Sequence, residues 1–168
     1  MNKEKTVSSH LISKSETATI LDEISSKWKI DIPKIKNLKC YYLPENAEII
    51  TGNGITILKI DDVYLPFLSN TEILEKFPYV IVDMGAVKFV CNGANVMRPG
   101  IRKHTEFEKD QIICVKEESK QKFLAVGKAL VSSIEMESLA KGEVVKNLHY
   151  ISDKYWEAKK KLKTSFFL

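Results

Sequence analysis

The sequence lacks the paired cysteines that a zinc site or a disulfide framework requires. It contains three cysteines, Cys40, Cys91 and Cys114, which form no Cys-x-x-Cys pair and have no histidine doublet nearby. A structural zinc site is therefore not expected, and scattered cysteines in odd number are typical of reducing compartments. We expect no metal and no cofactor, since a chain of 168 residues can bury enough surface to fold without either.

Long apolar runs are also missing. The longest uncharged apolar stretches, such as 79–82, fall far below the roughly 20 residues that a membrane helix needs. The first residues, 1–5, lead into no apolar stretch of signal-peptide length. Hydrophobic residues make up 44% and charged residues 29% of the chain, which is typical of a folded globular protein. We expect a cytoplasmic protein with no membrane partner.

Motifs of catalysis and nucleotide binding are absent as well. The three histidines, His10, His104 and His149, lie far apart in sequence, and none stands in a recognisable nucleophile, metal or triad context. The sequence contains no Walker phosphate loop, no dinucleotide-binding glycine motif and no His-Glu-x-x-His motif. These absences favour a binding protein over an enzyme.

The net charge of +4 is unevenly distributed along the chain. Residues 1–78 carry 10 basic and 11 acidic residues, whereas residues 79–168 carry 16 basic and 11 acidic residues. Four lysines and no acidic residue lie within 158–168. This basic end favours a polyanionic partner, most commonly nucleic acid. The alternative is a solvated helix end whose lysines oppose the helix macrodipole.

Residues 1–78 predict an α+β domain with one long helix on a small antiparallel sheet. Ser13 and Glu16 have the spacing of a capping box, and apolar residues recur after them at helical spacing. We expect Asp31-Ile32-Pro33 to end this helix. Strands are predicted over 7–12, 38–43, 48–51, 55–60 and 63–68, with a short helix over 73–77.

Residues 79–157 predict a mixed β domain in the form of a pseudo-barrel. Asp83 is the expected N-cap of a helix over 84–90, and Gly127 is expected to mark a bulge. Strands are predicted over 79–82, 111–116, 123–131 and 147–151, and a second helix over 133–141. No glycine-serine linker separates the halves, so we place the boundary after Pro78 and leave 158–168 as a basic tail or a final helix.

The stretch 83–101 is the most informative part of the chain. Small residues, Gly85 and Ala86, stand in the first turn of the predicted helix, so its free N–H groups can accept a phosphate or a nucleotide edge. Basic residues follow at positions 88, 98, 102 and 103. Free N–H groups next to basic side chains are suited to binding a nucleic-acid backbone or a splayed 3′ end. Alternatively, the small residues only allow the helix to pack on the sheet.

The same stretch resembles the core motif of the PUA domain, which is named for pseudouridine synthases and archaeosine transglycosylases. The similarity rests on Asp-x-Gly-Ala-Val-Lys-Phe-Val at 83–90 and on Gly-Ala-Asn-Val-Met-x-Pro-Gly-Ile at 93–101. Residues 125–127 and 147–156 continue it. Over nearly the whole chain the sequence is similar to the malignant-T-cell-amplified-sequence family of translation proteins, in its archaeal form, whose pre-PUA domain corresponds to 1–78.

This resemblance implies a non-catalytic RNA-binding protein. Its expected partners are the rRNA of the small ribosomal subunit and the 3′ end of tRNA, during initiation, reinitiation or recycling. Another translation factor, bound through the N-terminal domain, is left open as a partner. Phe89 and Ile101 can equally be core residues. The implied RNA-binding residues are Gly85, Ala86, Lys88, Phe89, Gly93, Ala94, Arg98, Pro99, Gly100, Ile101, Arg102 and Lys103.

Two alternatives stay open because a fold does not determine a function. The first is an RNA-binding accessory to an RNA modification or processing enzyme. The second is a scaffold whose N-terminal sheet mainly binds protein.

Overall fold

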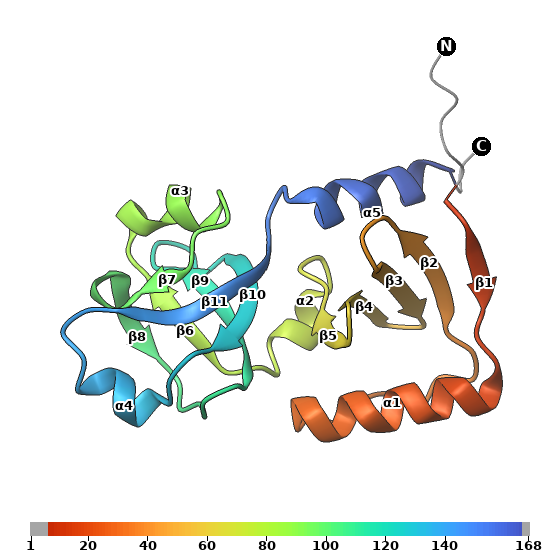
Figure 1. Cartoon of the computed structure of the whole chain (residues 1–168), viewed down its shortest axis with the longest axis horizontal. Coiled ribbons are helices and arrows are strands. Elements are labelled where there is room, and N and C mark those ends of the chain that lie inside the picture. Colours follow the sequence, from red (N-terminus) through yellow and green to blue (C-terminus); the bar gives the residue numbers. More distant parts are fainter. Residues whose placement is uncertain (1–6, 166–168) are drawn as a thin grey trace, which may run out of the picture. The chain divides into compact units, whose positions relative to one another are not determined.

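The computed structural model describes residues 7–165, which group into two compact units (Figure 1). The first unit contains the described residues up to Leu65 and those from Ala158 onward. The second unit contains Pro66–Glu157. The sequence predicts a boundary after Pro78. In the structure, residues 66–78 belong to the second unit instead.

The first unit is built on a five-stranded sheet whose strands follow one another in chain order, β1-β2-β3-β4-β5. The strands are β1 (Ser9–Leu11), β2 (Lys39–Leu43), β3 (Ala47–Gly52), β4 (Ile55–Ile60) and β5 (Val63–Pro66). A long helix, α1 (Lys14–Trp28), precedes β2 in the chain. It packs against this sheet, as expected (Figure 1). A hairpin turn at Asn53-Gly54 joins β3 and β4.

Helix α1 has a cap at each end. The Ser13 hydroxyl accepts a hydrogen bond from the backbone N–H of Glu16 at 3.2 Å, so Ser13 is the N-cap, as the capping-box spacing predicts. The helix ends at Trp28 because Lys29 adopts a left-handed φ of 56° and donates its N–H to a carbonyl of the last turn. The prediction that the helix runs to Asp31-Ile32-Pro33 was wrong.

The second unit contains a six-stranded mixed sheet that forms a nearly closed barrel (Figure 1). The strand order is β7-β11-β10-β9-β6-β8, and β6 runs parallel to β9. The strands are β6 (Tyr79–Val82), β7 (Val96–Met97), β8 (Ile101–His104), β9 (Ile112–Glu117), β10 (Phe123–Ala129) and β11 (Glu143–Tyr150). This architecture confirms the predicted α+β fold with a mixed pseudo-barrel.

Short helical segments connect these strands. They are α2 (Thr71–Leu74), the 3-10 turn η1 (Met84–Ala86), α3 (Val87–Val90), the 3-10 turn η2 (Arg98–Gly100) and α4 (Ser133–Glu137). Helix α4 is shorter than the predicted 133–141. Strand β8 was not predicted, because the basic residues at 102 and 103 hide any alternation of apolar and polar side chains.

The bulge predicted at Gly127 is present. The register of β10 against β11 shifts between Val126 and Gly127. A Cβ at position 127 would lie 2.2 Å from the carbonyl oxygen of Lys146, so only glycine fits there without a shift of the backbone.

The helix α5 (Lys154–Ser165) is anchored by a buried pair, His149 and Asp153. Nδ1 of His149 donates to the Asp153 carboxylate at 2.7 Å, because Nε2 of the same ring accepts the N–H of Leu68 at 3.2 Å. The carboxylate also accepts the N–H groups of Tyr150 and Trp156. Burial raises the pKa of Asp153, but these hydrogen bonds and the histidine outweigh it and lower the pKa overall. Of the predicted basic tail or final helix over 158–168, residues up to Ser165 are therefore helical, and 166–168 lie outside the described residues.

Candidate nucleic-acid interface

The candidate site begins where β6 ends, at Asp83. The Asp83 carboxylate caps η1 by accepting the N–H of Ala86 at 2.9 Å. The N–H of Met84 donates to the carboxylate of Glu118 at 3.3 Å. Two of the amides that we expected to be open are therefore already bonded to carboxylates, and the α-helix that follows has only four residues. Because carboxylates repel a phosphate, these two bonds disfavour a phosphate at this helix end, and the expectation of free N–H groups was wrong for Met84 and Ala86.

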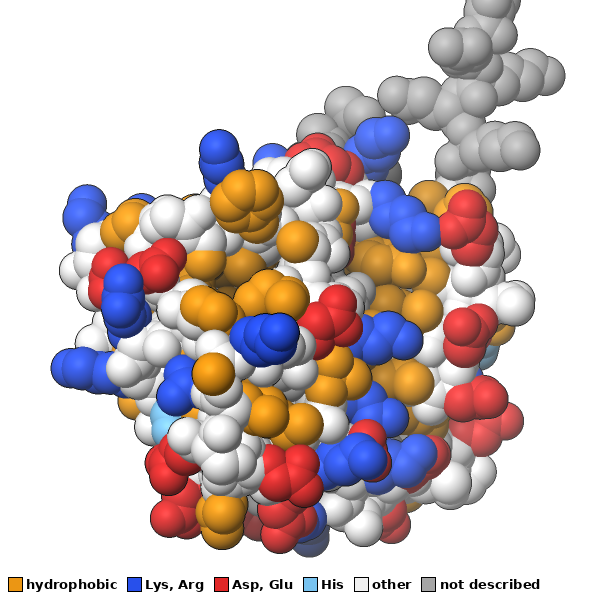
Figure 2. Space-filling view, turned by 60° about the vertical axis from the view of Figure 1, so that its left-hand side comes forward, with side chains coloured by type: hydrophobic (Ala, Val, Ile, Leu, Met, Phe, Trp, Pro, Cys, Tyr) orange, Lys and Arg blue, Asp and Glu red, His pale blue; other side chains and the backbone are white. Residues whose placement is uncertain are grey.

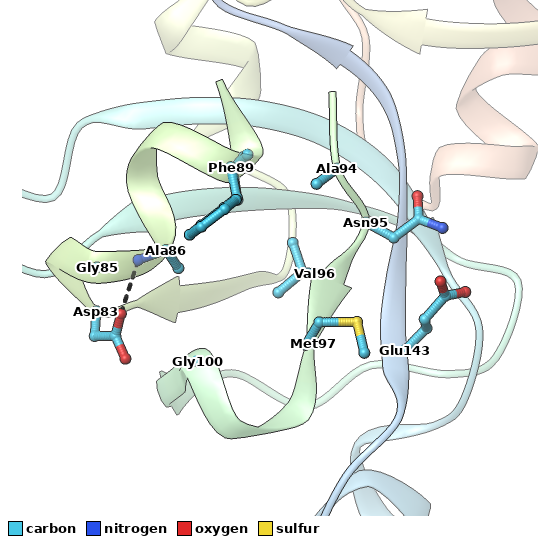
Figure 3. A pocket seen from close by; sticks show the side chains of 11 residues that line it. Asp83, Gly85, Ala86, Phe89, Ala94, Asn95, Val96, Met97, Gly100 and Glu143 are labelled. Carbon is cyan, nitrogen blue, oxygen red and sulfur yellow. Dashed lines mark hydrogen bonds between the residues drawn. The ribbon is translucent and has the colours of Figure 1, made fainter. Parts of the chain in front are cut away.

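A cavity of about 460 Å³ opens between α3 and β7 (Figure 3). The side chain of Phe89 comes from α3 and that of Met97 from β7, and they are 58% and 47% exposed. The lining is mostly apolar, and its full set is Asp83, Gly85, Ala86, Phe89, Val90, Ala94, Asn95, Val96, Met97, Gly100 and Glu143. A concave apolar surface with a few polar groups suits a flat ring such as an unstacked nucleobase.

Two turns shape this cavity. Gly93 has a φ of +93°, which favours glycine, and a Cβ there would lie 3.1 Å from the Tyr150 ring. Gly93 therefore turns the chain after α3 and allows Tyr150 of β11 to pass close to it. On the other side, η2 turns the chain from β7 into β8.

Asn147 of β11 holds the loop between α3 and β7. Its side-chain amide donates to the carbonyl oxygens of Val90 at 3.0 Å and Ala94 at 3.1 Å. Its backbone N–H donates to the side-chain oxygen of Asn95 at 2.9 Å. Sequence reasoning did not assign this positioning role, because the partners lie more than fifty residues away in the chain.

The structure places the twelve predicted site residues at different depths. Those on the surface are Gly85, Lys88, Phe89, Ala94, Pro99, Arg102 and Lys103, and those half-buried are Ala86, Gly93, Arg98 and Gly100. Ile101 is only 7% exposed and belongs to the barrel core, so its side chain lies beneath the surface. The sequence left open whether Phe89 and Ile101 are core residues. In the structure Ile101 is a core residue and Phe89 is not.

The basic residues of the site also differ in what they contact. Nζ of Lys88 lies 5.1 Å from the centroid of the Phe89 ring. The Arg102 guanidinium lies 3.5 Å from the Asp83 carboxylate. Arg98, in contrast, donates through Nε to the carbonyl oxygen of Met136 at 2.8 Å. On the face drawn in Figure 2, both basic and acidic side chains surround exposed hydrophobic ones.

The sequence did not identify Met84, Met97, Asn95 or Glu143 as site residues. Met84 is 49% exposed beside the cavity residue Gly85. Methionine is more often a core residue, so the sequence carries no local signal that Met84 and Met97 are exposed.

No metal centre emerges from the structure. Within residues 7–165, no three His, Cys, Asp or Glu side chains lie together so that they could hold a metal ion. Burial raises the pKa of Cys40 and of Cys114 to about 12, so these thiols stay protonated at neutral pH. Over the same span, no helix is long and apolar enough to cross a membrane.

Comparison with known proteins places this geometry in a family. Residues 78–151 match the model of the PUA domain. An uncharacterized protein of Methanocaldococcus jannaschii is 36% identical over 76% of this chain and 80% of its own length. Malignant T-cell-amplified sequence 1-A of Xenopus laevis is 34% identical over 76% of this chain and 75% of its own length. The chain belongs to the malignant T-cell-amplified sequence family.

Further relatives agree with this assignment. Translation machinery-associated protein 20 of Eremothecium gossypii is 30% identical over 79% of this chain and 84% of its own length. The crystal structure of a hypothetical protein of Pyrococcus horikoshii superposes with a TM-score of 0.75 at 28% identity, over 90% of this chain and 99% of that one. A conserved PUA domain protein of Thermoplasma acidophilum gives 0.72 at 27% identity, with the same coverage. The PUA domain suggests RNA binding, and the family contains translation-associated proteins.

Proposed function

We propose that this protein is a non-catalytic RNA-binding factor of cytoplasmic translation. It binds the small ribosomal subunit, the 3′ end of tRNA, or both, in initiation, reinitiation or recycling. The observation that carries the proposal is the cavity beside α3, which is open, mostly apolar and flanked by the exposed Phe89 and Met97 side chains. Membership in a family with translation-associated members supports the same assignment.

The cavity suits a base rather than a phosphate. Two carboxylates, Asp83 and Glu143, line it and disfavour an anion inside, whereas a nucleobase can stack on the Phe89 ring. Stacking of a base on an aromatic side chain contributes about 1–3 kcal/mol. The polar groups of Asn95 and Glu143 lie where they can hydrogen-bond to the edge of a base. A single-stranded end, whose bases are free to leave the stack, is the substrate that this geometry favours.

The direct test is co-sedimentation of the full-length protein with purified small ribosomal subunits, with and without tRNA, over a series of salt concentrations. Saturable, stoichiometric binding that weakens steeply with salt is the expected result, because phosphate contacts release counterions. Binding to free structured RNA without any association with the subunit would instead favour an accessory of an RNA modification enzyme. The absence of binding to subunit, tRNA and free RNA at low salt would overturn the proposal.

A further inference from the structure

Lys116 of β9 is held between two aromatic rings from the strands on either side of it. Its Nζ lies 4.2 Å from the ring centroid of Tyr79 in β6 and 4.8 Å from that of Phe123 in β10. Contacts of this kind attract the ammonium group to the faces of the rings. A free lysine side chain loses about 2 kcal/mol of rotamer entropy when a ligand fixes it. The two rings restrict Lys116 in advance, so it is a preorganised cation.

Lys116 belongs to a row of residues across four strands of the barrel. Phe123 pairs with Lys116, Lys116 pairs with Ile81, and Ile81 pairs with Lys103 of β8. Residues paired in register point to the same face of a sheet. Val80 belongs to the barrel core, so the row Lys103–Ile81–Lys116–Phe123 lies on the outer face of the barrel, where Ile81 is only 6% exposed. We call it the lysine row.

The lysine row is connected to the cavity through β8. This strand begins directly after Gly100, which lines the cavity, and Lys103 is its third residue. Neighbouring strands lie about 4.8 Å apart, so the backbones of Lys103 and Lys116, two strands apart, are separated by about 10 Å. No carboxylate in the described part of the chain lies within 4.0 Å of either ammonium group. Lys103 is exposed and Lys116 is half-buried, so neither positive charge is neutralised by a carboxylate of the described residues.

We infer that Lys103 and Lys116 bind the phosphates of a single RNA strand whose terminal base occupies the cavity beside α3. The inference rests on the proposed function and extends it, since it assigns a path for the RNA backbone outside the cavity. The cavity supplies contacts to a base. The two lysines of the row supply positive charge, which the lining of the cavity lacks. Lys116 is thus more than a stabiliser of the sheet.

The test compares RNAs of two lengths by fluorescence polarisation. A trinucleotide reaches only the cavity, whereas a single strand of about twelve nucleotides spans the cavity and the lysine row. The double variant Lys103→Gln, Lys116→Gln should bind the longer RNA roughly tenfold more weakly and lower the salt slope by about 0.7 per lysine. Its affinity for the trinucleotide should stay unchanged.

Two single variants refine the test. Lys116→Arg keeps the charge and the contact with the rings, so it should bind both RNAs as the wild type does. Lys59→Gln is the matched control, because Nζ of Lys59 also lies over an aromatic ring, at 5.4 Å from Tyr64, but on β4 of the first unit. Lys103 is exposed, so Lys103→Gln alone gives a folded protein even if Lys116→Gln loosens the sheet.

The outcomes separate the inference from the proposed function. If the wild type binds the longer RNA and the double variant binds it equally well, the lysine row is not an RNA contact. An equal loss in Lys116→Arg and Lys116→Gln would also overturn the inference, since charge would then be irrelevant. If the wild type binds neither RNA, nor the small subunit, the proposed function itself fails.

Discussion

The guanidinium of Arg98 is bonded to the backbone of Met136, with Nε donating to the carbonyl oxygen at 2.8 Å. Arg98 lies in η2 and Met136 in α4, so this bond joins the turn beside the cavity to a helix almost forty residues later. Hydrogen bonds from a charged donor contribute about 1.5–3 kcal/mol. We therefore expect Arg98→Gln to lower the free energy of unfolding by about that amount, as measured by urea denaturation.

Lys88 is the matched control for Arg98. It is exposed, and its ammonium group lies over the neighbouring Phe89 ring, so Lys88→Gln should change the free energy of unfolding by no more than about 0.5 kcal/mol. The same variant should weaken RNA binding, because it removes a cation at the edge of the cavity. An Arg98→Gln variant as stable as the wild type would contradict this division of roles.

Phe89→Ala should weaken the binding of a single-stranded RNA end without unfolding the protein. The ring is 58% exposed, so its removal leaves no internal cavity, and the loss of one stacked base costs about 1–3 kcal/mol of binding free energy. Phe89→Trp should retain binding. Isothermal titration calorimetry measures both, and Ile134→Ala, at an 82% exposed position on α4, is the control. Equal affinities for Phe89→Ala and the wild type would rule out the cavity as the base site.

Features that depend on neighbours in sequence could be predicted. Ser13 and Asp83 cap helices because a cap needs only an acceptor two or three residues before a free N–H group. The turn at Gly93 follows from a backbone conformation that favours glycine. These local rules, with the PUA-like motif, were enough to predict the α+β fold.

Features that depend on distant segments could not be predicted. Arginine is a residue type that commonly contacts RNA, but the carbonyl group that Arg98 binds belongs to a helix far along the chain. Phe89 and Ile101 are both apolar residues of one motif, and only the packing of the barrel shows that one is exposed and the other buried. The lysine row exists only after β6, β8, β9 and β10 pair in register, and β8 itself has no apolar alternation that would reveal it.

Gly127→Ala should be strongly destabilising. A Cβ at this position would lie 2.2 Å from the carbonyl oxygen of Lys146 and 2.8 Å from Val145 Cγ1, and the backbone of β11 cannot move without breaking its pairing with β10. Overpacking typically costs about 1–3 kcal/mol, and a contact as short as this one places the cost at the upper end of that range. Gly85→Ala is the control, because its nearest contact would be the Asp83 carboxylate at 3.3 Å. Thermal unfolding that gives the same midpoint for both variants would show that the bulge tolerates a side chain.

The carboxylate of Glu117 organises the turn between β9 and β10 and should make stability depend on pH. It accepts the hydroxyl of Ser119 and the N–H groups of Ser119, Lys120 and Lys122, the last two at 2.7 and 3.0 Å. The Ser119 hydroxyl first, and then the backbone N–H groups, lower the pKa of Glu117 from 4.5 to about 2, although burial opposes this. Protonation of the folded protein would break these bonds.

The sign of the effect follows from proton binding. The unfolded chain takes up a proton on this group near pH 4.5, whereas the folded chain does so only near pH 2. The stabilisation by Glu117 is therefore complete above pH 4.5 and is lost as the pH falls toward 2. Urea denaturation at a series of pH values should show Glu117→Gln to be less stable than the wild type at neutral pH. The difference should shrink below pH 4.5. Glu106→Gln, at an exposed position, is the control. A wild-type minus Glu117→Gln difference that stays constant down to pH 2 would contradict the assigned role.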